Sequence, residues 1–329
     1  MRVVVTGGAG FIGSHYVRTL LAGGYPAFAG SDVVVLDALT YAGTLTNLIS
    51  VRDDPRLTFV EGDVCDAEVV DDVLTGADVL VHFAAESHVD RSITGAAEFV
   101  RTNVLGTQTL LDAALRRRVG KVVAVSTDEV YGSIEHGSWP ETDPLLPNSP
   151  YAASKAGADL IARSYARTHG LDVSVTRGSN TYGPYQFPEK VIPLFTTNLV
   201  DGLPVPLYGD GANVREWLHV ADHCDGIQAV AERGRAGEVY NVGGGTELTN
   251  WELTERLLEL TGRGPDLVEP VADRKAHDRR YSVDCTKIRA ELGYEPRVSF
   301  EQGLTDVVAW YRDHREWWEP LKARARLGA

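Results

Sequence analysis

The stretch Arg2-Val3-Val4-Val5-Thr6-Gly7-Gly8-Ala9-Gly10-Phe11-Ile12-Gly13 decides the fold of this chain. The valine run is short and β-branched, as expected of a buried strand, and residues 14–21 are compatible with a helix. A glycine-rich turn lies between them. Such a turn lets a pyrophosphate approach the backbone and meet the amides at a helix N-terminus. The predicted contacts with a bound dinucleotide are Gly7, Gly10, Phe11, Ile12 and Gly13.

Further short apolar runs alternate with helical patterns along the first half of the chain, for instance a helical pattern at 99–115. This alternation predicts an α/β fold with a Rossmann-type doubly wound parallel sheet. In such folds ligands bind at the carboxyl ends of the strands, so the residues just after each run are expected to line a ligand cleft. The apolar runs are 33–36, 57–60, 79–83, 121–125 and 173–176.

The second strand is expected to end in Asp37, where a dinucleotide fold places the acid that hydrogen-bonds the adenosine ribose. Residues 38–40 contain no arginine for a 2′-phosphate, which favours NAD over NADP. The alternative for Asp37 is a helix cap or a turn residue, and its place at a strand end argues against that. Further cofactor contacts are expected at Asp63, Val64, Ala84, Ala85, Ser87, Asn103, Tyr151 and Lys155.

The character of the sequence changes after Gly178. Residues 180–185 begin a stretch rich in Pro, Gly and Tyr, which predicts a crossing into a smaller mixed α/β lobe. We therefore expect residues 1–179 to form the NAD-binding lobe and residues 180–329 to form mainly the lobe that binds substrate. A helix at 217–231 and a strand at 238–242 are expected to return to the first lobe, so the chain would cross the boundary more than once.

The composition limits the possible partners. The 329 residues include 32 basic and 46 acidic ones, and the formal charge of -14 disfavours nucleic acid and anionic membranes. No apolar run is long enough to span a bilayer, and the chain starts directly with its first strand, so a cytoplasmic location is expected. Cys65, Cys224 and Cys285 lack metal-ligand or disulfide spacing, so neither a metal site nor a disulfide framework is predicted.

Two groups of reactive residues follow the fifth apolar run. Thr127-Asp128-Glu129 comes directly after it, at the expected ligand cleft. Ser149-Pro150 suits a helix N-terminus, which would place Tyr151 and Lys155 on one helical face. An ammonium beside a phenol stabilises the phenolate and lowers the phenol pKa, so Tyr151 would become a usable base. Each pattern alone has an ordinary alternative, namely a solvated turn for the acids and a plain amphipathic helix for the other two.

The glycine turn together with Tyr151-Ala152-Ala153-Ser154-Lys155 resembles the extended short-chain dehydrogenase/reductase family, whose members handle nucleotide sugars with a bound NAD. Three further stretches, 87–92, 126–132 and 180–190, closely resemble the dTDP-glucose 4,6-dehydratase branch of that family. The resemblance extends from the N-terminus to about Tyr294. It implies a nucleotide sugar, dTDP-glucose, as the substrate and a tightly bound NAD that is recycled within each turnover.

The resemblance also implies a reaction. Tyr151, helped by Lys155, would take the proton of the sugar 4-hydroxyl while NAD oxidises C4. Glu129 would remove the C5 proton as Asp128 protonates the departing 6-hydroxyl, and reduction at C6 would regenerate NAD. Thr127 would hydrogen-bond the 4-oxygen. An acid and a base acting on one sugar ring suit an elimination of water, whereas an epimerase does not need that pair.

A set of substrate-binding residues follows from the same resemblance. Its arginines suit a diphosphate, although a single arginine is more often a surface ion-pair partner. For His88, a structural role is as compatible with the sequence as a role in positioning the substrate. The sequence departs from the usual family pattern at Lys275-Ala276, where Pro-Gly is common, so the loop shape there is not carried over from the family. The implied residues are Ser87, His88, Thr127, Asn180, Glu189, Lys190, Arg215, Asn241, Arg274 and His277.

Family members pair through helices of the first lobe, which implies a homodimer. Ala152, Ala156, Leu160 and Ile161 form an apolar stripe that suits such a contact, unless the stripe faces the core. Two alternatives to the leading function remain open. One is a dehydratase or epimerase of another nucleotide sugar, and the other is a non-catalytic NAD-binding sensor. A sensor would need the glycine turn but would have no use for the tyrosine, the lysine and the acid pair together.

Overall fold

The computed structural model describes the backbone of residues 1–327 and the side chains of residues 1–325. Its larger sheet has seven strands in the order β10-β6-β5-β4-β1-β2-β3, and all neighbouring strands are parallel. The order reverses between β1 and β4, which is the switch point of a doubly wound sheet. This confirms the predicted fold class. The strands are β1 Arg2–Thr6, β2 Asp32–Asp37, β3 Leu57–Glu61, β4 Val79–His82, β5 Lys121–Thr127, β6 Val173–Gly178 and β10 Val239–Val242.

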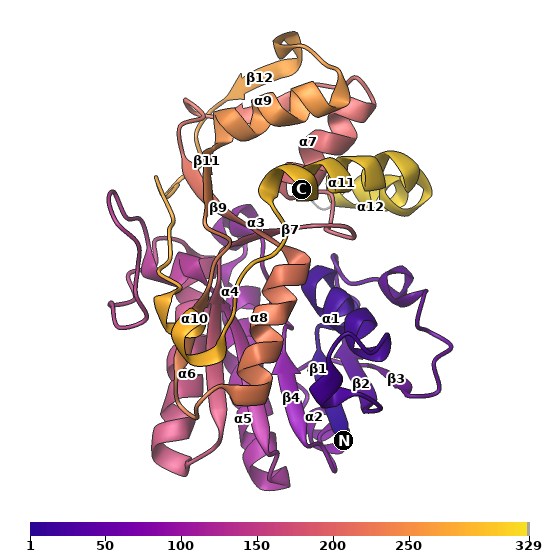
Figure 1. The fold of residues 1–329 in the computed structure, drawn as a ribbon, viewed down its shortest axis with the longest axis vertical. Coiled ribbons are helices and arrows are strands. Elements are labelled where there is room, and N and C mark those ends of the chain that lie inside the picture. Colours follow the sequence, from indigo (N-terminus) through magenta and orange to yellow (C-terminus); the bar gives the residue numbers. More distant parts are fainter. Residues whose placement is uncertain (328–329) are drawn as a thin grey trace.

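Both faces of this sheet are buried, which explains why its strands read as continuous apolar runs. In β1, Val3 and Val5 belong to one core cluster, which includes residues of α1 and α8, whereas Val4 belongs to a second cluster with residues of α2, α5 and α6. Figure 1 shows α1 and α8 on the near face of the sheet. These helices are α1 Phe11–Leu21, α2 Ala67–Val73, α5 Gly106–Arg117, α6 Pro150–His169 and α8 Val220–Arg233.

The smaller lobe lies beyond the carboxyl ends of the parallel strands, in the upper part of Figure 1. It contains a three-stranded sheet, β11-β9-β7, and a parallel pair of β12 with β8. A third core cluster, with Trp217, Phe300 and Trp318, fills it. The strands are β7 Asn180–Tyr182, β8 Val205–Tyr208, β9 Val214–His219, β11 Thr246–Thr249 and β12 Val268–Val271, and the helices are α7 Val191–Val200, α9 Asn250–Thr261, α11 Phe300–Asp313 and α12 Arg315–Leu327.

Two predicted helices have other bounds in the structure. The helix expected from residue 217 begins at Val220, because Trp217 pairs with Asn180 and Thr246 in the smaller sheet. The pattern at 99–115 is divided into the end of α4, a π-helical turn η3 and the helix α5. The predicted strand at 238–242 is β10, which pairs with β6 at the edge of the larger sheet. The division of the chain into lobes at residue 179 stays a prediction.

Short helical segments connect these elements. In the described part of the chain, no helix has the length and apolar character needed to cross a membrane. The segments are η1 Pro26–Phe28, η2 Leu45–Leu48, α3 Val89–Thr94, α4 Ala96–Phe99, η3 Val100–Leu105, η4 Asp128–Tyr131, η5 Pro265–Leu267 and α10 Thr286–Leu292.

Candidate active site

The glycine turn joins β1 to α1 at the carboxyl edge of the sheet. Gly7 has a φ of +69°, and a Cβ on it would lie 2.6 Å from the backbone nitrogen of Ala84. A Cβ on Gly13 would lie 2.3 Å from the carbonyl oxygen of Gly7. Gly10 is the N-cap of α1, so the first amides of the helix, from Phe11 onward, face the turn. The turn therefore has no room for a side chain at Gly7 or Gly13 and presents a helix N-terminus, which fits a dinucleotide pyrophosphate.

Asp37, the last residue of β2, lies beside this turn. Its Oδ2 accepts a hydrogen bond from the Ala9 amide at 2.9 Å, and its Oδ1 accepts one from the Leu39 amide at 2.9 Å. Burial raises the pKa of this carboxyl, and the amides of Leu39, Ala9 and Gly10 act in the opposite direction. The carboxylate lies at a strand end beside the glycine turn, so Asp37 fits the ribose hydroxyls of NAD.

Two loops carry the remaining predicted cofactor contacts. Ala84, Ala85 and Ser87 follow β4, and Ala84 touches the glycine turn. Asp63 follows β3, where its Oδ1 accepts from the Cys65 amide at 2.8 Å and its Oδ2 lies 2.9 Å from an Arg101 nitrogen. The neighbouring Val64 is buried.

Asn103, a predicted cofactor contact, has a side chain held by protein groups. Its Oδ1 accepts from the Glu86 amide at 2.9 Å, and its Nδ2 donates to the Glu86 carbonyl at 3.0 Å and to the Ser154 hydroxyl at 2.8 Å. The residue is 1% exposed. Asn103 therefore fastens the loop after β4 to α6, and its contact with the cofactor stays a prediction.

The acid pair lies in η4, directly after β5. Asp128 is 2% exposed, and its Oδ1 accepts from the Thr127 hydroxyl at 3.2 Å. Among the described residues its Oδ2 has no hydrogen-bond partner. Burial is the main cause that raises the pKa of Asp128 well above its ordinary value, and the charges of Glu129 and Glu216 add to this effect. A raised pKa favours the protonated carboxyl, which is the form that a general acid needs.

Glu129 has more cations among its neighbours than Asp128 has. Burial and the charge of Asp278 raise the pKa of Glu129, but the cations Lys190 and Arg215 lower it and favour the charged form. Arg215 also lowers the pKa of Asp128, so the two carboxyl groups differ in degree. This difference fits the predicted acid role of Asp128 and the predicted base role of Glu129.

Tyr151 and Lys155 share one face of α6, and the Ser149 hydroxyl caps that helix by accepting from the Ala152 amide at 3.1 Å, as predicted. The Lys155 ammonium donates to the Val125 carbonyl at 2.7 Å, and burial lowers its pKa to about 8. The expectation of a lowered phenol pKa is wrong for this structure. Burial and the nearby charge of Glu129 raise the pKa of Tyr151 well above its ordinary value.

A buried ion pair connects α6 and η4, the two segments that carry the predicted catalytic residues. Arg177, at the end of β6, donates from Nε to Asp159 Oδ2 at 2.8 Å and from Nη2 to Asp159 Oδ1 at 3.1 Å. Its Nη1 donates to the Tyr131 hydroxyl at 2.6 Å. Both charged side chains are 0% exposed. Because Asp159 belongs to α6 and Tyr131 to η4, one guanidinium holds together the helix of Lys155 and the turn of Glu129.

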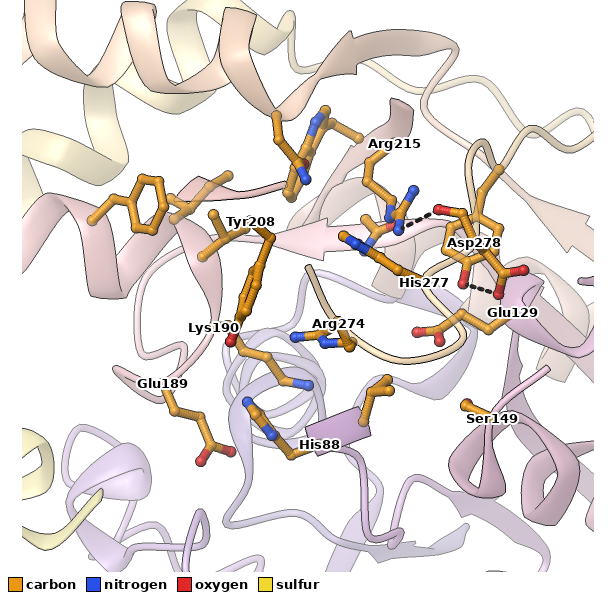
Figure 2. Close-up of a pocket in the computed structure, with 18 of the residues that line it drawn as sticks. His88, Glu129, Ser149, Glu189, Lys190, Tyr208, Arg215, Arg274, His277 and Asp278 are labelled. Carbon is orange, nitrogen blue, oxygen red and sulfur yellow. Dashed lines mark hydrogen bonds between the residues drawn. The ribbon is translucent and has the colours of Figure 1, made fainter. Parts of the chain in front are cut away.

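A cavity of about 170 Å³, open to solvent, lies between the two lobes; Glu129 lines it, whereas Asp128 does not. Figure 2 shows the nitrogen ends of Lys190, Arg274 and His88 turned toward one another, with the Glu129 carboxylate pointing at them from another side. The predicted residues that line the cavity are His88, Glu129, Asn180, Glu189, Lys190, Arg215, Arg274 and His277.

Several cavity side chains are held by protein partners. Lys190 Nζ donates to the Ser87 carbonyl at 2.7 Å, and an Arg215 nitrogen donates to the Asp278 carbonyl at 3.0 Å. Arg274 Nε lies 2.6 Å from an oxygen of Asp90. The three cations therefore sit in one cavity at fixed positions, and such a group suits a diphosphate.

Other polar residues of the cavity complete this arrangement. Burial, with the charges of Lys190 and Arg274, lowers the pKa of His88 to about 3, so this imidazole is neutral. His277 Nδ1 lies 2.6 Å from an oxygen of Asp273. The Asn180 Oδ1 is buried without a hydrogen-bond partner in the described structure, so it is available to a ligand donor.

Asn241, predicted to bind substrate, has a side chain held by protein groups, and its substrate contact stays a prediction. It is 0% exposed and does not line the cavity. Its Oδ1 accepts from the Tyr131 hydroxyl at 2.9 Å, and its Nδ2 donates to two backbone carbonyls. Asn250, which the sequence analysis missed, lines the cavity as the first residue of α9. The capping box of Thr249 with Glu252 was a sequence signal for that helix end.

Tyr208 and Tyr281 were also missed. The guanidinium carbon of Arg274 lies 5.2 Å from the ring centroid of Tyr208, and that of Arg215 lies 4.3 Å from the ring centroid of Tyr281. The two rings thus orient the two arginines within the cavity.

A doubly wound sheet, a glycine turn with Asp37, and a Tyr151–Lys155 helix beside a cationic cavity define an NAD-dependent enzyme of the extended short-chain dehydrogenase/reductase class. Comparison with known proteins narrows the class. A family model described as GDP-mannose 4,6 dehydratase matches residues 4–307, and the chain belongs to this family.

Individual relatives agree with the resemblance seen in the sequence. A dTDP-glucose 4,6-dehydratase from Streptomyces antibioticus is 65% identical over 98% of this chain and 96% of its own length. The crystal structure of DesIV, a dTDP-glucose 4,6-dehydratase from Streptomyces venezuelae with NAD bound, is 64% identical, covers 98% of this chain and 100% of that chain, and has a TM-score of 0.97. A UDP-glucose 4-epimerase from Thermotoga maritima is 34% identical, with a TM-score of 0.86 over 95% of this chain and 99% of that chain.

Proposed function

We propose that this chain is an NAD-dependent hydro-lyase that converts dTDP-glucose to dTDP-4-keto-6-deoxy-glucose and water. The observation that carries this function is the buried acid pair Asp128 and Glu129, in which Glu129 lines the cavity and has more cations around it than Asp128 has. The relatives with the higher identities are named dTDP-glucose 4,6-dehydratases. An epimerase of another nucleotide sugar is less favoured because it needs no such pair.

NAD fits the glycine turn and Asp37, with Tyr151 and Lys155 as further predicted contacts. When bound, NAD supplies the hydride acceptor for C4 and, once reduced, the donor for C6. Tyr151 removes the proton of the 4-hydroxyl, and Thr127 hydrogen-bonds the 4-oxygen. The Lys155 ammonium, charged below a pKa of about 8, favours the phenolate that forms.

The elimination step uses the two carboxyl groups. Once C4 carries a carbonyl, the C5 proton is acidic, and the charged Glu129 carboxylate removes it. Asp128, whose protonated form burial favours, gives its proton to the 6-hydroxyl as that oxygen leaves as water. Protonation of the leaving group and removal of the C5 proton therefore come from two neighbouring residues with separated roles.

The cations of the cavity hold the nucleotide end of the substrate. Arg215 and Arg274 bind the diphosphate with directed donors, and Lys190 adds a point charge beside them. Asn180 and Asn250 provide hydrogen bonds from the strand β7 and the helix α9.

The function is tested by incubating the NAD-loaded protein with dTDP-glucose, CDP-glucose, UDP-glucose and GDP-mannose. We expect a 4-keto-6-deoxy product from dTDP-glucose at the highest rate. A higher rate with another nucleotide sugar would identify that sugar as the substrate instead. No product from any of them, with NAD still bound, would support the non-catalytic sensor instead.

The assigned roles are tested in single turnovers. Tyr151→Phe is expected to block oxidation at C4, whereas Asp128→Asn and Glu129→Gln are expected to let reduced cofactor accumulate because water loss is slow. Normal water loss in both acid-pair variants would overturn the assignment.

We also propose a homodimer formed through η3 and α6. Val100, Leu105 and Leu160 on these neighbouring elements are 54%, 48% and 53% exposed, which is unusual for large apolar side chains. Of the predicted stripe, Ala152 and Ala156 are buried and face the core. Leu160→Glu is expected to shift the mass in solution to that of a monomer. A cytoplasmic location stays a prediction from composition.

A further inference from the structure

The C-terminal helices reach back to the cofactor side of the larger lobe through a cluster of aromatic rings. Tyr185 lies in the segment that enters the smaller lobe, Trp310 in α11 and Trp317 in α12. The ring centroid of Tyr185 is 4.7 Å from that of Trp310 and 5.5 Å from that of Trp317. The Arg18 guanidinium, from α1, lies 4.3 Å from the Tyr185 centroid. We call Tyr185, Trp310 and Trp317 the aromatic latch.

A chain of hydrogen bonds connects this latch to the glycine turn. The Trp317 indole nitrogen donates to Asn47 Oδ1 at 3.0 Å, across 270 positions of sequence. Asn47 is 1% exposed, and its Nδ2 donates to the carbonyl of Ala9 at 2.9 Å. Arg18 donates to the Asn47 carbonyl at 2.5 Å. One buried amide thus links α12 to a residue of the turn that would hold the pyrophosphate.

Ala9 is held on its other side by the ribose-binding candidate. Its amide donates to Asp37 Oδ2 at 2.9 Å, and its carbonyl also accepts from the Thr44 amide at 3.1 Å. Arg324 of α12 donates to the Thr40 carbonyl in the same loop. The helix α12 therefore contacts residues 38–48 at two points, at Asn47 and at Thr40.

Backbone strain marks both ends of this connection. Leu39, in the loop after Asp37, has a φ of +48°, and Tyr185, in the latch, has a φ of +67°. Side chains other than glycine rarely adopt this left-handed conformation, and it persists only where surrounding contacts enforce it. The contacts around Leu39 and Tyr185 therefore hold both residues in backbone conformations that they would rarely adopt without those contacts.

From these contacts we infer that α12 fastens the glycine turn and residues 38–48 in their cofactor-binding conformation, so that the dinucleotide is released slowly. Release of NAD from this site requires the loop beside Asp37 to move, and the bond from Trp317 to Asn47 opposes that movement. The reaction gives the hydride back to the sugar, so the cofactor has no need to leave between turnovers. The inference depends on NAD as the cofactor and not on which sugar is converted.

The test measures the rate at which NADH leaves the NADH-loaded full-length protein when excess NAD is added, followed by NADH fluorescence. Trp317→Phe keeps the aromatic body of the latch and removes only the indole N–H. Loss of one hydrogen bond to a buried group is expected to speed release by about tenfold. The matched control is Trp251→Phe, which also removes one indole N–H bond, to Glu255 at 2.9 Å, on the far helix α9. The control is expected to leave the release rate unchanged.

Asn47→Ala tests the same bond from its other end. If Trp317 acts through Asn47, the double variant releases NADH no faster than Asn47→Ala alone. Equal release from Trp317→Phe and the wild type would overturn the inference, as would independent, multiplying effects of the two substitutions. If Trp317→Phe lowers the urea midpoint so far that the variant cannot be loaded with NADH, the release rate of Asn47→Ala alone tests the inference. An unchanged NADH release rate in that variant would contradict the inference. Failure to convert dTDP-glucose would leave this result untouched.

Discussion

Asp159→Asn is expected to destabilise the folded chain by about 3–5 kcal/mol, because it removes the charge partner of a cation with no access to water. In the wild type Arg177 makes two charge-assisted hydrogen bonds to Asp159, and bonds of this kind contribute about 1.5–3 kcal/mol each. After the substitution Arg177 keeps the Tyr131 hydroxyl at 2.6 Å and a marginal contact with the Glu141 carbonyl at 3.5 Å. The asparagine would offer one acceptor and would turn an amide donor toward the guanidinium.

Urea unfolding of the NAD-free protein, followed by tryptophan fluorescence, measures this loss as a fall in the denaturation midpoint. Asp53→Asn is the control, since its ion pair with Arg52 is exposed and no measurable change is expected. The double variant Asp159→Leu with Arg177→Met removes both buried charges and is expected to regain more than half of the loss. A loss below about 1 kcal/mol in Asp159→Asn, or a double variant less stable than the single one, would refute the reasoning.

Three smaller changes probe local features. Ala276→Gly is expected to stabilise the protein by about 1 kcal/mol in urea unfolding, because Ala276 has a φ of +51°, whereas Ala153→Gly on α6 is expected to destabilise it. For Lys155, burial lowers the pKa from 10.5 to about 8, so the unfolded chain binds this proton more tightly than the folded chain does. The wild type should therefore gain stability relative to Lys155→Met as the pH rises from about 8 to about 10.5. A constant difference between about pH 7 and about pH 10 would contradict this. For Asp128 the pKa is raised, so Asp128→Asn should be more stable than the wild type at neutral pH, and urea midpoints should converge as the pH falls toward 3.8.

The parallel sheet was predictable because its strands are buried on both faces and therefore appear as valine-rich runs between helical patterns. The glycine turn and Ser149 were predictable because their signals are local: a missing side chain and a hydroxyl one residue before a proline. In the same way, the order of residues around the turn was enough to indicate the cofactor class.

The hydrogen bonds that Asn103 and Asn241 make inside the protein could not be predicted from the sequence, because their partners come from distant segments. Asn241 bonds to Tyr131, 110 positions away, and Asn103 to Ser154, 51 positions away. The pKa of Tyr151 was unpredictable for a related reason. Its direction depends on burial and on Glu129, and neither is visible in the spacing to Lys155.

The strand β10 has a consequence for how this protein is made. It supplies one edge of the larger sheet, beside β6, but it is synthesised only after β7, β8 and β9 of the smaller lobe. On the ribosome, β6 therefore presents an open, pairing-competent edge until residue 242 has emerged. A chimera that exchanges the smaller lobe between relatives must keep β10 with its native sheet, so one cut point is not enough.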